Sequence, residues 1–138
     1  MKKIIHLSDL HVGHKECGDR FRLIIESISG TCQPSSDYIV VITGDIADNA
    51  FRREHHDEAA AGILKLEESG YRVLVVPGNH DYGTGILGHR KFVGLFKEKF
   101  FHDRRISYPK VDLIDEFAFI GLDSTAWELN WHDRFFSE

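Results

Sequence analysis

Four short apolar runs, separated by segments in which apolar residues recur at helical spacing, constrain the fold of this chain more than any other feature. The runs span residues 4–7, 38–43, 71–76 and 117–122, and they are rich in β-branched and aromatic side chains. They do not alternate apolar with polar residues, which is typical of strands buried on both faces of a sheet. We therefore expect four buried strands.

Three apolar stripes at helical spacing lie between these runs. They fall within residues 21–28, 59–66 and 92–100, and Gly70 is a natural stop for the second. Alternating strands and helices imply right-handed βαβ units around a largely parallel sheet. The predicted fold class is α/β.

A polar cluster directly follows each of the first three runs. The clusters are Ser-Asp-Leu-His at 8–11, Gly-Asp-Ile-Ala-Asp at 44–48 and Pro-Gly-Asn-His-Asp at 77–81. Parallel α/β sheets bind ligands beyond the carboxyl ends of their strands. We expect the three clusters to converge on one rim.

The first two clusters contain candidate metal ligands. Asp9 and His11 are two residues apart and can face one side, and a carboxylate with an imidazole suits Mn, Fe or Zn better than Ca. Asp45 can offer its two oxygens to two cations. Asp48 can orient a metal-binding side chain without binding the metal itself. The competing interpretation is that these residues only cap loops and helices and that the histidine is exposed.

The third cluster adds a neutral ligand and an acid–base group. Asn79 offers an amide oxygen, and His80 can donate to a phosphate oxygen or protonate a leaving alkoxide. Asp81 is expected to fix the tautomer of His80 and raise its basicity. The alternative is a simple Gly-Asn turn that follows a strand.

In this order, and directly after apolar strands, Asp-x-His, Gly-Asp-x-x-Asp and Gly-Asn-His-Asp resemble the calcineurin-like metallophosphoesterase superfamily. The resemblance covers essentially the whole chain. It implies an αββα sandwich, represented here by its N-terminal βαβαβ half, with two divalent metals (Mn, Fe or Zn) at one rim.

The resemblance also implies a role for each site residue. Asp9 and His11 would bind the first metal, Asp45 would bridge, and Asn79 would bind the second metal. His80 would contact the scissile phosphate with the support of Asp81. A metal-bridging hydroxide would attack phosphorus in line.

The later histidine motifs of that superfamily are not found. Gly88 and His89 lack the second histidine of a Gly-His-x-His segment, and His132 lacks a strand-ending glycine before it. We therefore expect residues 1–138 to form a single domain, the N-terminal part of a metallophosphoesterase domain. With about four ligands, the site could hold two metals, one or none. A homodimer is expected to cover the apolar surface that such a half domain leaves open.

The remaining histidines have simpler interpretations. His55 and His56 are expected to open a polar helix face, and His102 to lie in a charged turn. His6 is expected to face a neighbour in the first strand. His14 is close enough to the first cluster to approach a substrate, although a solvated loop position is the competing interpretation.

Composition narrows the partners and the location. The net charge of −5 argues against a long nucleic acid, and no run reaches the roughly 20 apolar residues that span a bilayer. Cys17 and Cys32 show no disulfide framework, so the cytoplasm is the default location. The residues after Gly44 and Asp45 lack the Arg-Gly of protein phosphatases, which favours a small phosphodiester or phosphomonoester.

Two functions of different classes follow. The first is a metal-dependent phosphoesterase. The second is a truncated, non-catalytic metallophosphoesterase-like module that acts in binding or assembly. A nucleotide-binding P-loop and a Gly-x-Ser-x-Gly elbow are both absent from the sequence.

Overall fold

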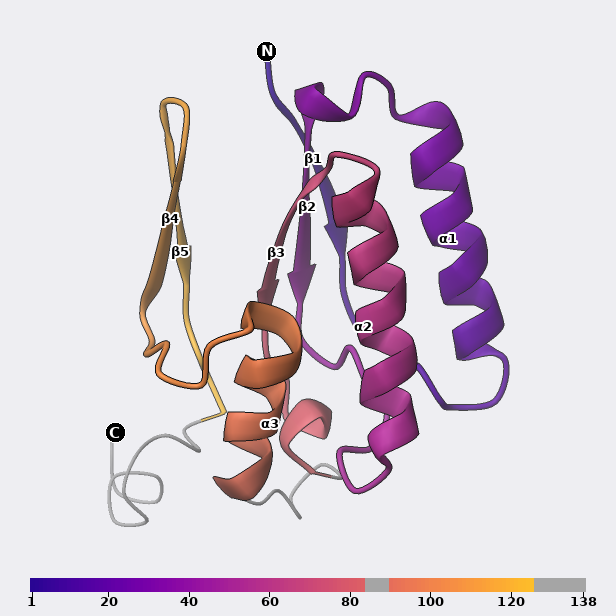
Figure 1. The fold of residues 1–138 in the computed structure, drawn as a ribbon, viewed down its shortest axis with the longest axis vertical. Coiled ribbons are helices and arrows are strands. Elements are labelled where there is room, and N and C mark those ends of the chain that lie inside the picture. The colour runs from indigo at the N-terminus through magenta and orange to yellow at the C-terminus, as the bar shows by residue number, and fades with distance from the viewer. Residues whose placement is uncertain (84–89, 126–138) are drawn as a thin grey trace.

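A three-stranded parallel sheet organises the protein, whose computed structural model describes residues 1–83 and 90–125. Its strands lie in the order β1 (Lys3–Leu7), β2 (Tyr38–Thr43) and β3 (Arg72–Val76) (Figure 1). Both strand pairs are parallel, so all three carboxyl ends lie at one edge. The predicted α/β class and the parallel sheet are confirmed.

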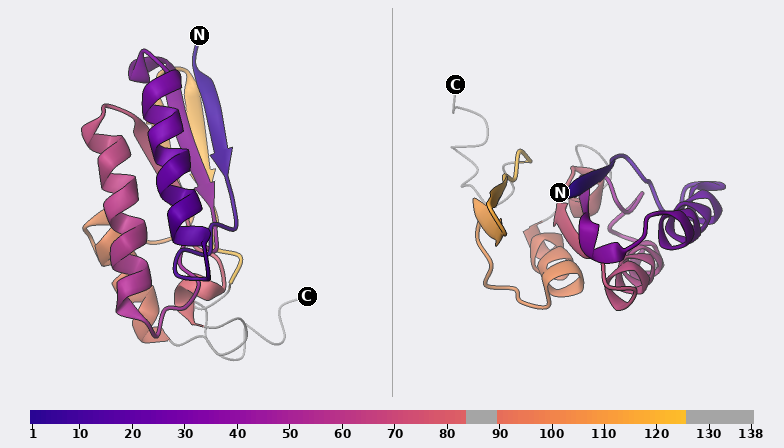
Figure 2. Two further views of the ribbon diagram at one scale, coloured as in Figure 1. Left: turned by 90° about the vertical axis from the view of Figure 1, so that its right-hand side faces the viewer. Right: turned by 90° about the horizontal axis from the view of Figure 1, so that it is seen from above.

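Two of the three α-helices in the described part of the chain cover one face of this sheet. α1 (Cys17–Thr31) and α2 (Arg53–Glu68) lie side by side in front of the strands (Figure 2). α3 (Arg90–Phe101) packs against α2 and against the short helix η2 (His80–Tyr82). All three helices form where apolar residues recur at helical spacing, as the sequence predicted.

The core lies between the sheet and the helices. Val40 and Ile42 of β2 are fully buried there, and they face Phe21 and Ile25 of α1 and Leu66 of α2 within one apolar cluster. Each buried side chain of this size contributes about 1.5–3 kcal/mol to folding. This packing fixes the strand ends, and therefore the rim beyond them.

The fourth apolar run does not join the parallel sheet, contrary to expectation. It forms β5 (Phe117–Gly121), which pairs antiparallel with β4 (Lys110–Ile114), a strand that the sequence analysis missed. Only residues 115–116 connect the two strands. So short a link allows a hairpin, whereas parallel neighbours need a crossover of a dozen or more residues. The hairpin lies on the other side of the sheet from α1 (Figures 1 and 2).

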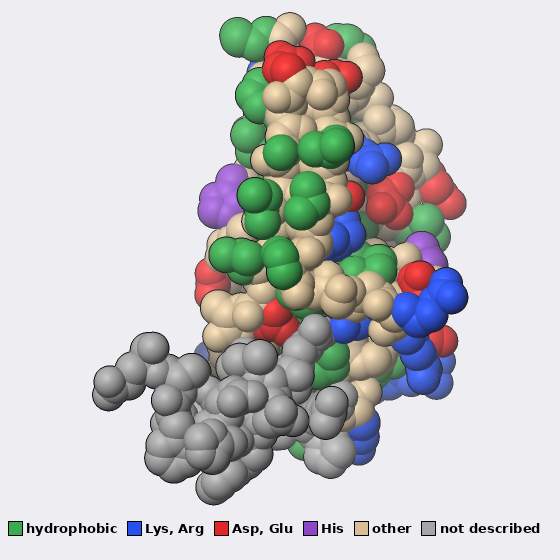
Figure 3. All heavy atoms as spheres, turned by 90° about the vertical axis from the view of Figure 1, so that its left-hand side faces the viewer, with side chains coloured by type: hydrophobic (Ala, Val, Ile, Leu, Met, Phe, Trp, Pro, Cys, Tyr) green, Lys and Arg blue, Asp and Glu red, His purple; other side chains and the backbone are tan. Residues whose placement is uncertain are grey.

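The prediction that the strands are buried on both faces was also wrong for β1 and for β5 of the hairpin. β1 is an edge strand, and its Ile4 is 60% exposed. Along the hairpin, four of the exposed apolar side chains form an outer row made of Val111, Leu113, Ile120 and Leu122. Figure 3 shows apolar side chains gathered along this face. The layers, helices then sheet then hairpin, match the N-terminal half of an αββα sandwich.

Within residues 1–83 and 90–125, no helix combines the length and apolar character needed to cross a bilayer.

Candidate functional site

Backbone hydrogen bonds join the loop after β1 to the loop after β2. The N–H of Asp9 donates to the carbonyl of Gly44 (3.2 Å), and that of His11 to the carbonyl of Asp45 (2.9 Å). Val12 continues the series by donating to Ile46 at 2.9 Å. The two loops therefore extend the parallel pairing beyond the strands and bring the first two polar clusters side by side.

Three candidate ligands at this rim have an unusual backbone conformation. The φ angles of Asp9, His11 and Asp45 are 53°, 44° and 48°, in the left-handed region that residues with a side chain rarely adopt. Each such residue costs about 1 kcal/mol or more, and such strain clusters at functional sites. The hydrogen bonds between the loops hold this arrangement.

The side chains of these three residues meet. One ligand atom from each of Asp9, His11 and Asp45 lies within 4.8 Å of the other two. His11 Nε2 is 3.9 Å from Asp45 Oδ2, and both side chains are only partly exposed. Two carboxylates and an imidazole form a donor set that fits a divalent transition metal.

The loop after β3 packs directly onto Asp45. Gly78 makes this possible, because a Cβ atom there would lie 2.2 Å from Asp45 Oδ1 and 2.3 Å from its backbone nitrogen. Two residues later, the N–H of His80 donates to Asp45 Oδ1 at 2.9 Å. Asn79 lies between them, with an exposed side chain. All three clusters thus converge on one rim, as expected.

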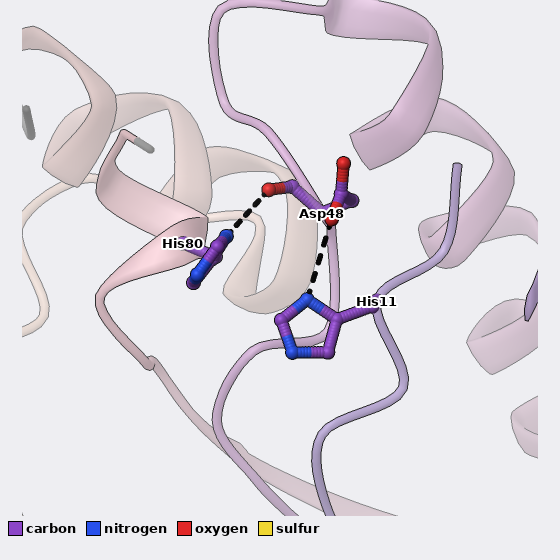
Figure 4. A group of neighbouring side chains, drawn as sticks. All are labelled: His11, Asp48 and His80. Carbon is purple, nitrogen blue, oxygen red and sulfur yellow. Dashed lines mark hydrogen bonds and ion pairs between the residues drawn. The ribbon is translucent and has the colours of Figure 1, made fainter. Parts of the chain in front are cut away.

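Asp48 contacts two histidines of the rim at once (Figure 4). Its carbonyl oxygen accepts a hydrogen bond from His80 Nδ1 at 2.7 Å, and its Oδ1 lies 3.4 Å from His11 Nδ1. Because a carbonyl can only accept, Nδ1 of His80 carries a proton. These contacts leave Nε2 of both rings for a metal or a substrate.

The same three residues, His11, Asp48 and His80, also have ligand atoms within 4.8 Å of one another. However, the hydrogen bond to Asp48 already occupies Nδ1 of His80. The geometry therefore favours an orienting role for Asp48, with the metal ligands on the other side of His11. His14, half exposed, has its Nδ1 3.7 Å from Asp48 Oδ1.

Comparison with known proteins decides the family. The sequence profile of the calcineurin-like phosphoesterases matches residues 2–136. The chain belongs to the calcineurin-like phosphoesterase family. Members of this family hydrolyse phosphate esters and typically bind divalent metals, which agrees with the donor set at the rim.

One curated relative is the uncharacterized metallophosphoesterase YkuE of Bacillus subtilis (strain 168). It is 33% identical over 82 residues, which make up 59% of this chain and 27% of YkuE. The matched part of the chain thus spans about a quarter of that relative.

In this calcineurin-like chain, Asp81 does not do what the sequence analysis expected. Its side chain is fully buried and accepts N–H hydrogen bonds from Ala47 (2.8 Å), Gly78 (2.9 Å) and Ile46 (3.2 Å). Burial raises the pKa of Asp81 to about 7, and the negative charge of Asp45 acts on this pKa in the same direction. The three N–H donors oppose the shift, because they stabilise the charged carboxylate. The carbonyl of Asp48, instead of Asp81, fixes the tautomer of His80.

The interpretation of His55 and His56 as a polar face was wrong. His56 is fully buried, and its Nε2 donates to the carbonyl of Asp81 at 3.1 Å. Burial lowers its pKa to about 4, although the hydrogen bond to Asp81 opposes the shift. The sequence did contain the signal, because positions 55 and 56 lie four and three residues before Ala59 and continue its apolar stripe.

His55 packs against the loop after β1. A Cβ atom at Gly13, whose φ is +103°, would lie 2.3 Å from the His55 ring. The two buried histidines of α2 therefore support two of the three site loops from below.

His6 and His102 have simpler surroundings than the two buried histidines of α2. His6 Nε2 is hydrogen-bonded to Thr43 Oγ1 at 2.7 Å, so it faces a neighbouring strand. His102 follows α3 and is exposed. His89 and His132 lie outside the described residues.

Proposed function

We propose that this chain carries the first ligands of a metal-dependent phosphoesterase that hydrolyses a small phosphodiester or phosphomonoester. The observation that supports it most is the meeting of Asp9, His11 and Asp45 beside His80. In this proposal residues 1–138 form one domain, the N-terminal part of a metallophosphoesterase domain.

The rim residues divide the work between metal and substrate. Asp9 and His11 would hold a first cation, Asp45 would bridge to a second, and Asn79 would hold the second through its amide oxygen. Bound Mn, Fe or Zn ions would supply a water nucleophile activated at neutral pH and would offset the charge of the phosphate. The two oxygens of Asp45 suit bridging, since Oδ2 faces His11 while Oδ1 accepts the N–H of His80.

His80 acts on the substrate through Nε2. Because its Nδ1 donates to the carbonyl of Asp48, the ring is held in one orientation. When the ring carries a proton on both nitrogens, Nε2 can donate to a phosphate oxygen or give its proton to the leaving alkoxide, and the ring is left neutral with its proton on Nδ1. The proposed role of Asp48 is to keep both His11 and His80 in place.

Net charge and cysteine content support the proposals for the substrate and the location. The net charge of −5 disfavours a long polyanion such as a nucleic acid, which leaves a small phosphate ester. Cys17 and Cys32 are both free thiols, which suits the reducing cytoplasm.

An Mn²⁺-dependent assay with bis(4-nitrophenyl) phosphate and 4-nitrophenyl phosphate tests the proposal. We expect Asp45→Asn to lower the rate by about a hundredfold or more, because it removes the bridging charge. Asparagine tolerates the left-handed conformation of Asp45, so the backbone stays intact.

The matched control is Asp115→Asn, at the turn of the hairpin. Asp115 also has a positive φ, 52°, and its side chain is 54% exposed. We expect this variant to retain wild-type activity. Activity that survives Asp45→Asn would exclude the metal mechanism.

The alternative function is a non-catalytic module for binding or assembly. The outer row of the hairpin favours it, because four large apolar side chains in solvent mark an interaction surface. Absence of both activity and bound Mn²⁺ in the wild-type chain would favour this alternative.

A further inference from the structure

Asp81 lies deeper in the protein than a carboxylate that contacts a metal or a substrate would have to lie. It is fully buried, yet it lies two residues from Asn79 and directly follows His80 in the chain. Among the described residues, its oxygens accept hydrogen bonds from backbone N–H groups, two on the loop after β2 and one on the loop after β3. It therefore links two site loops that are more than 30 residues apart in the sequence.

The loop after β2 requires such an acceptor. The N–H groups of Ile46 and Ala47 both point to Asp81, and both residues are fully buried. A buried N–H without an acceptor destabilises the fold, so the carboxylate satisfies both donors at once. The third donor, Gly78, brings the other loop to the same carboxylate.

These contacts determine where Asp45 lies. Asp45 immediately precedes Ile46, and Gly78 lies so close to it that a single added carbon would collide with Oδ1. The N–H of His80 then donates to that same Oδ1 at 2.9 Å. The separation between Asp45 and His80 thus follows from the hydrogen bonds of Asp81, although none of these bonds joins Asp81 to the side chain of Asp45 or His80.

The position of Asp81 is supported from α2. Its carbonyl accepts the Nε2 proton of His56, which is also fully buried. Side chain and backbone of Asp81 are therefore held by three different segments.

We propose that Asp81 is a positioning residue whose buried carboxylate sets the distance between the bridging carboxylate Asp45 and the substrate-binding His80. This inference rests on the proposed function and assigns Asp81 no contact with the substrate. The sequence predicted that Asp81 supports the ring of His80. In this inference Asp81 instead supports the backbone segments that carry Asp45 and His80.

Amide hydrogen exchange of Asp81→Asn tests the inference without requiring metal or activity. Asparagine keeps the shape but turns an NH₂ group toward at least one of the backbone donors. The decisive amide is that of His80, because it donates to Asp45 and not to Asp81. We expect it to exchange about tenfold faster, or more, together with the amides of Ile46 and Ala47.

Tyr71→Phe is the matched control. The Tyr71 hydroxyl is a buried donor within hydrogen-bond distance of two backbone carbonyls, of Ile28 (2.9 Å) and Cys32 (2.6 Å), near the opposite end of β3. Its loss destabilises the fold without touching the rim. We expect wild-type exchange at His80 in this variant. Wild-type exchange at His80 in Asp81→Asn would overturn the inference.

If Asp81→Asn does not fold, Asp81→Glu takes its place. Glutamate keeps the charge, but its extra methylene pushes the loops apart, so faster exchange at His80 is again expected and unchanged exchange overturns the inference. Titration with Mn²⁺ adds a second measurement, with affinity expected to fall about tenfold or more relative to Tyr71→Phe. If the wild type binds no Mn²⁺, the proposed function fails while the exchange experiment still decides the role of Asp81.

Discussion

At the scale of single residues, the rim depends on close contacts that particular side chains permit. His80 and Asp81 are neighbours in the short helix η2, where about three residues make a turn and adjacent side chains point about 120° apart. One of the two therefore reaches the rim while the other turns into the core. This explains why the pair divides into a surface histidine and a buried carboxylate.

Gly78 gives a prediction at this scale. A methyl group at this position would overlap Asp45, so we expect Gly78→Ala to lower the free energy of unfolding by about 1–3 kcal/mol and to weaken Mn²⁺ binding. Urea denaturation and metal titration measure the two effects. Gly30→Ala in α1 is the control, since a Cβ there meets no atom within 4 Å and alanine favours a helix. Equal stability of the two variants would contradict the prediction.

At the scale of elements, α2 does more than cover the sheet. Its first turn places His55 under the loop after β1 and His56 under Asp81, so the helix supports the rim at two points. Both rings are buried and each has an Nδ1 without a hydrogen-bond partner. The buried site therefore disfavours the charged form of His56.

The pH dependence of stability follows from the neutral His56. Its folded pKa of about 4 lies below the ordinary 6.5, so between these values the unfolded chain binds a proton that the folded chain does not. The contribution of His56 is complete above about pH 6.5 and is lost as the pH falls toward 4, by roughly 3 kcal/mol.

His56→Gln removes this dependence, while the ionisation of Asp81 is common to both proteins. We expect the stability difference between wild type and His56→Gln to shrink by roughly 3 kcal/mol from about pH 7 to about pH 4. Denaturant titrations at the two pH values measure it. The exposed His102→Gln serves as control, and a difference independent of pH would show that His56 takes up its proton in the folded chain.

At the scale of the whole molecule, one side of the fold is closed and the other is open. Helices α1 and α2 close one face of the sheet, whereas the hairpin presents its outer row to solvent (Figure 3). Exposed apolar rows on a hairpin with free strand edges favour association. On the basis of this surface we propose a homodimer formed through the outer row.

Size-exclusion chromatography with light scattering tests the dimer. We expect the wild-type chain to elute as a dimer and Leu113→Asp as a monomer, because a charge in the centre of the outer row opposes burial. Leu23→Asp, on the exposed side of α1, carries the same substitution away from the hairpin and is expected to remain dimeric. A wild-type chain that elutes as a clean monomer would exclude the dimer.

The sequence by itself determined the helices, the three parallel strands and the convergence of Asp9, Asp45 and Asn79 at one rim. It could do so because periodicity is local and because parallel strands end at a common edge. The burial of His56 could be inferred from its spacing to Ala59. Only the tertiary structure decided the pairing of β4 with β5 and the position of Asp81. Those depend on which face a side chain turns to and on distances of a few ångströms between loops, which spacing along the chain does not encode.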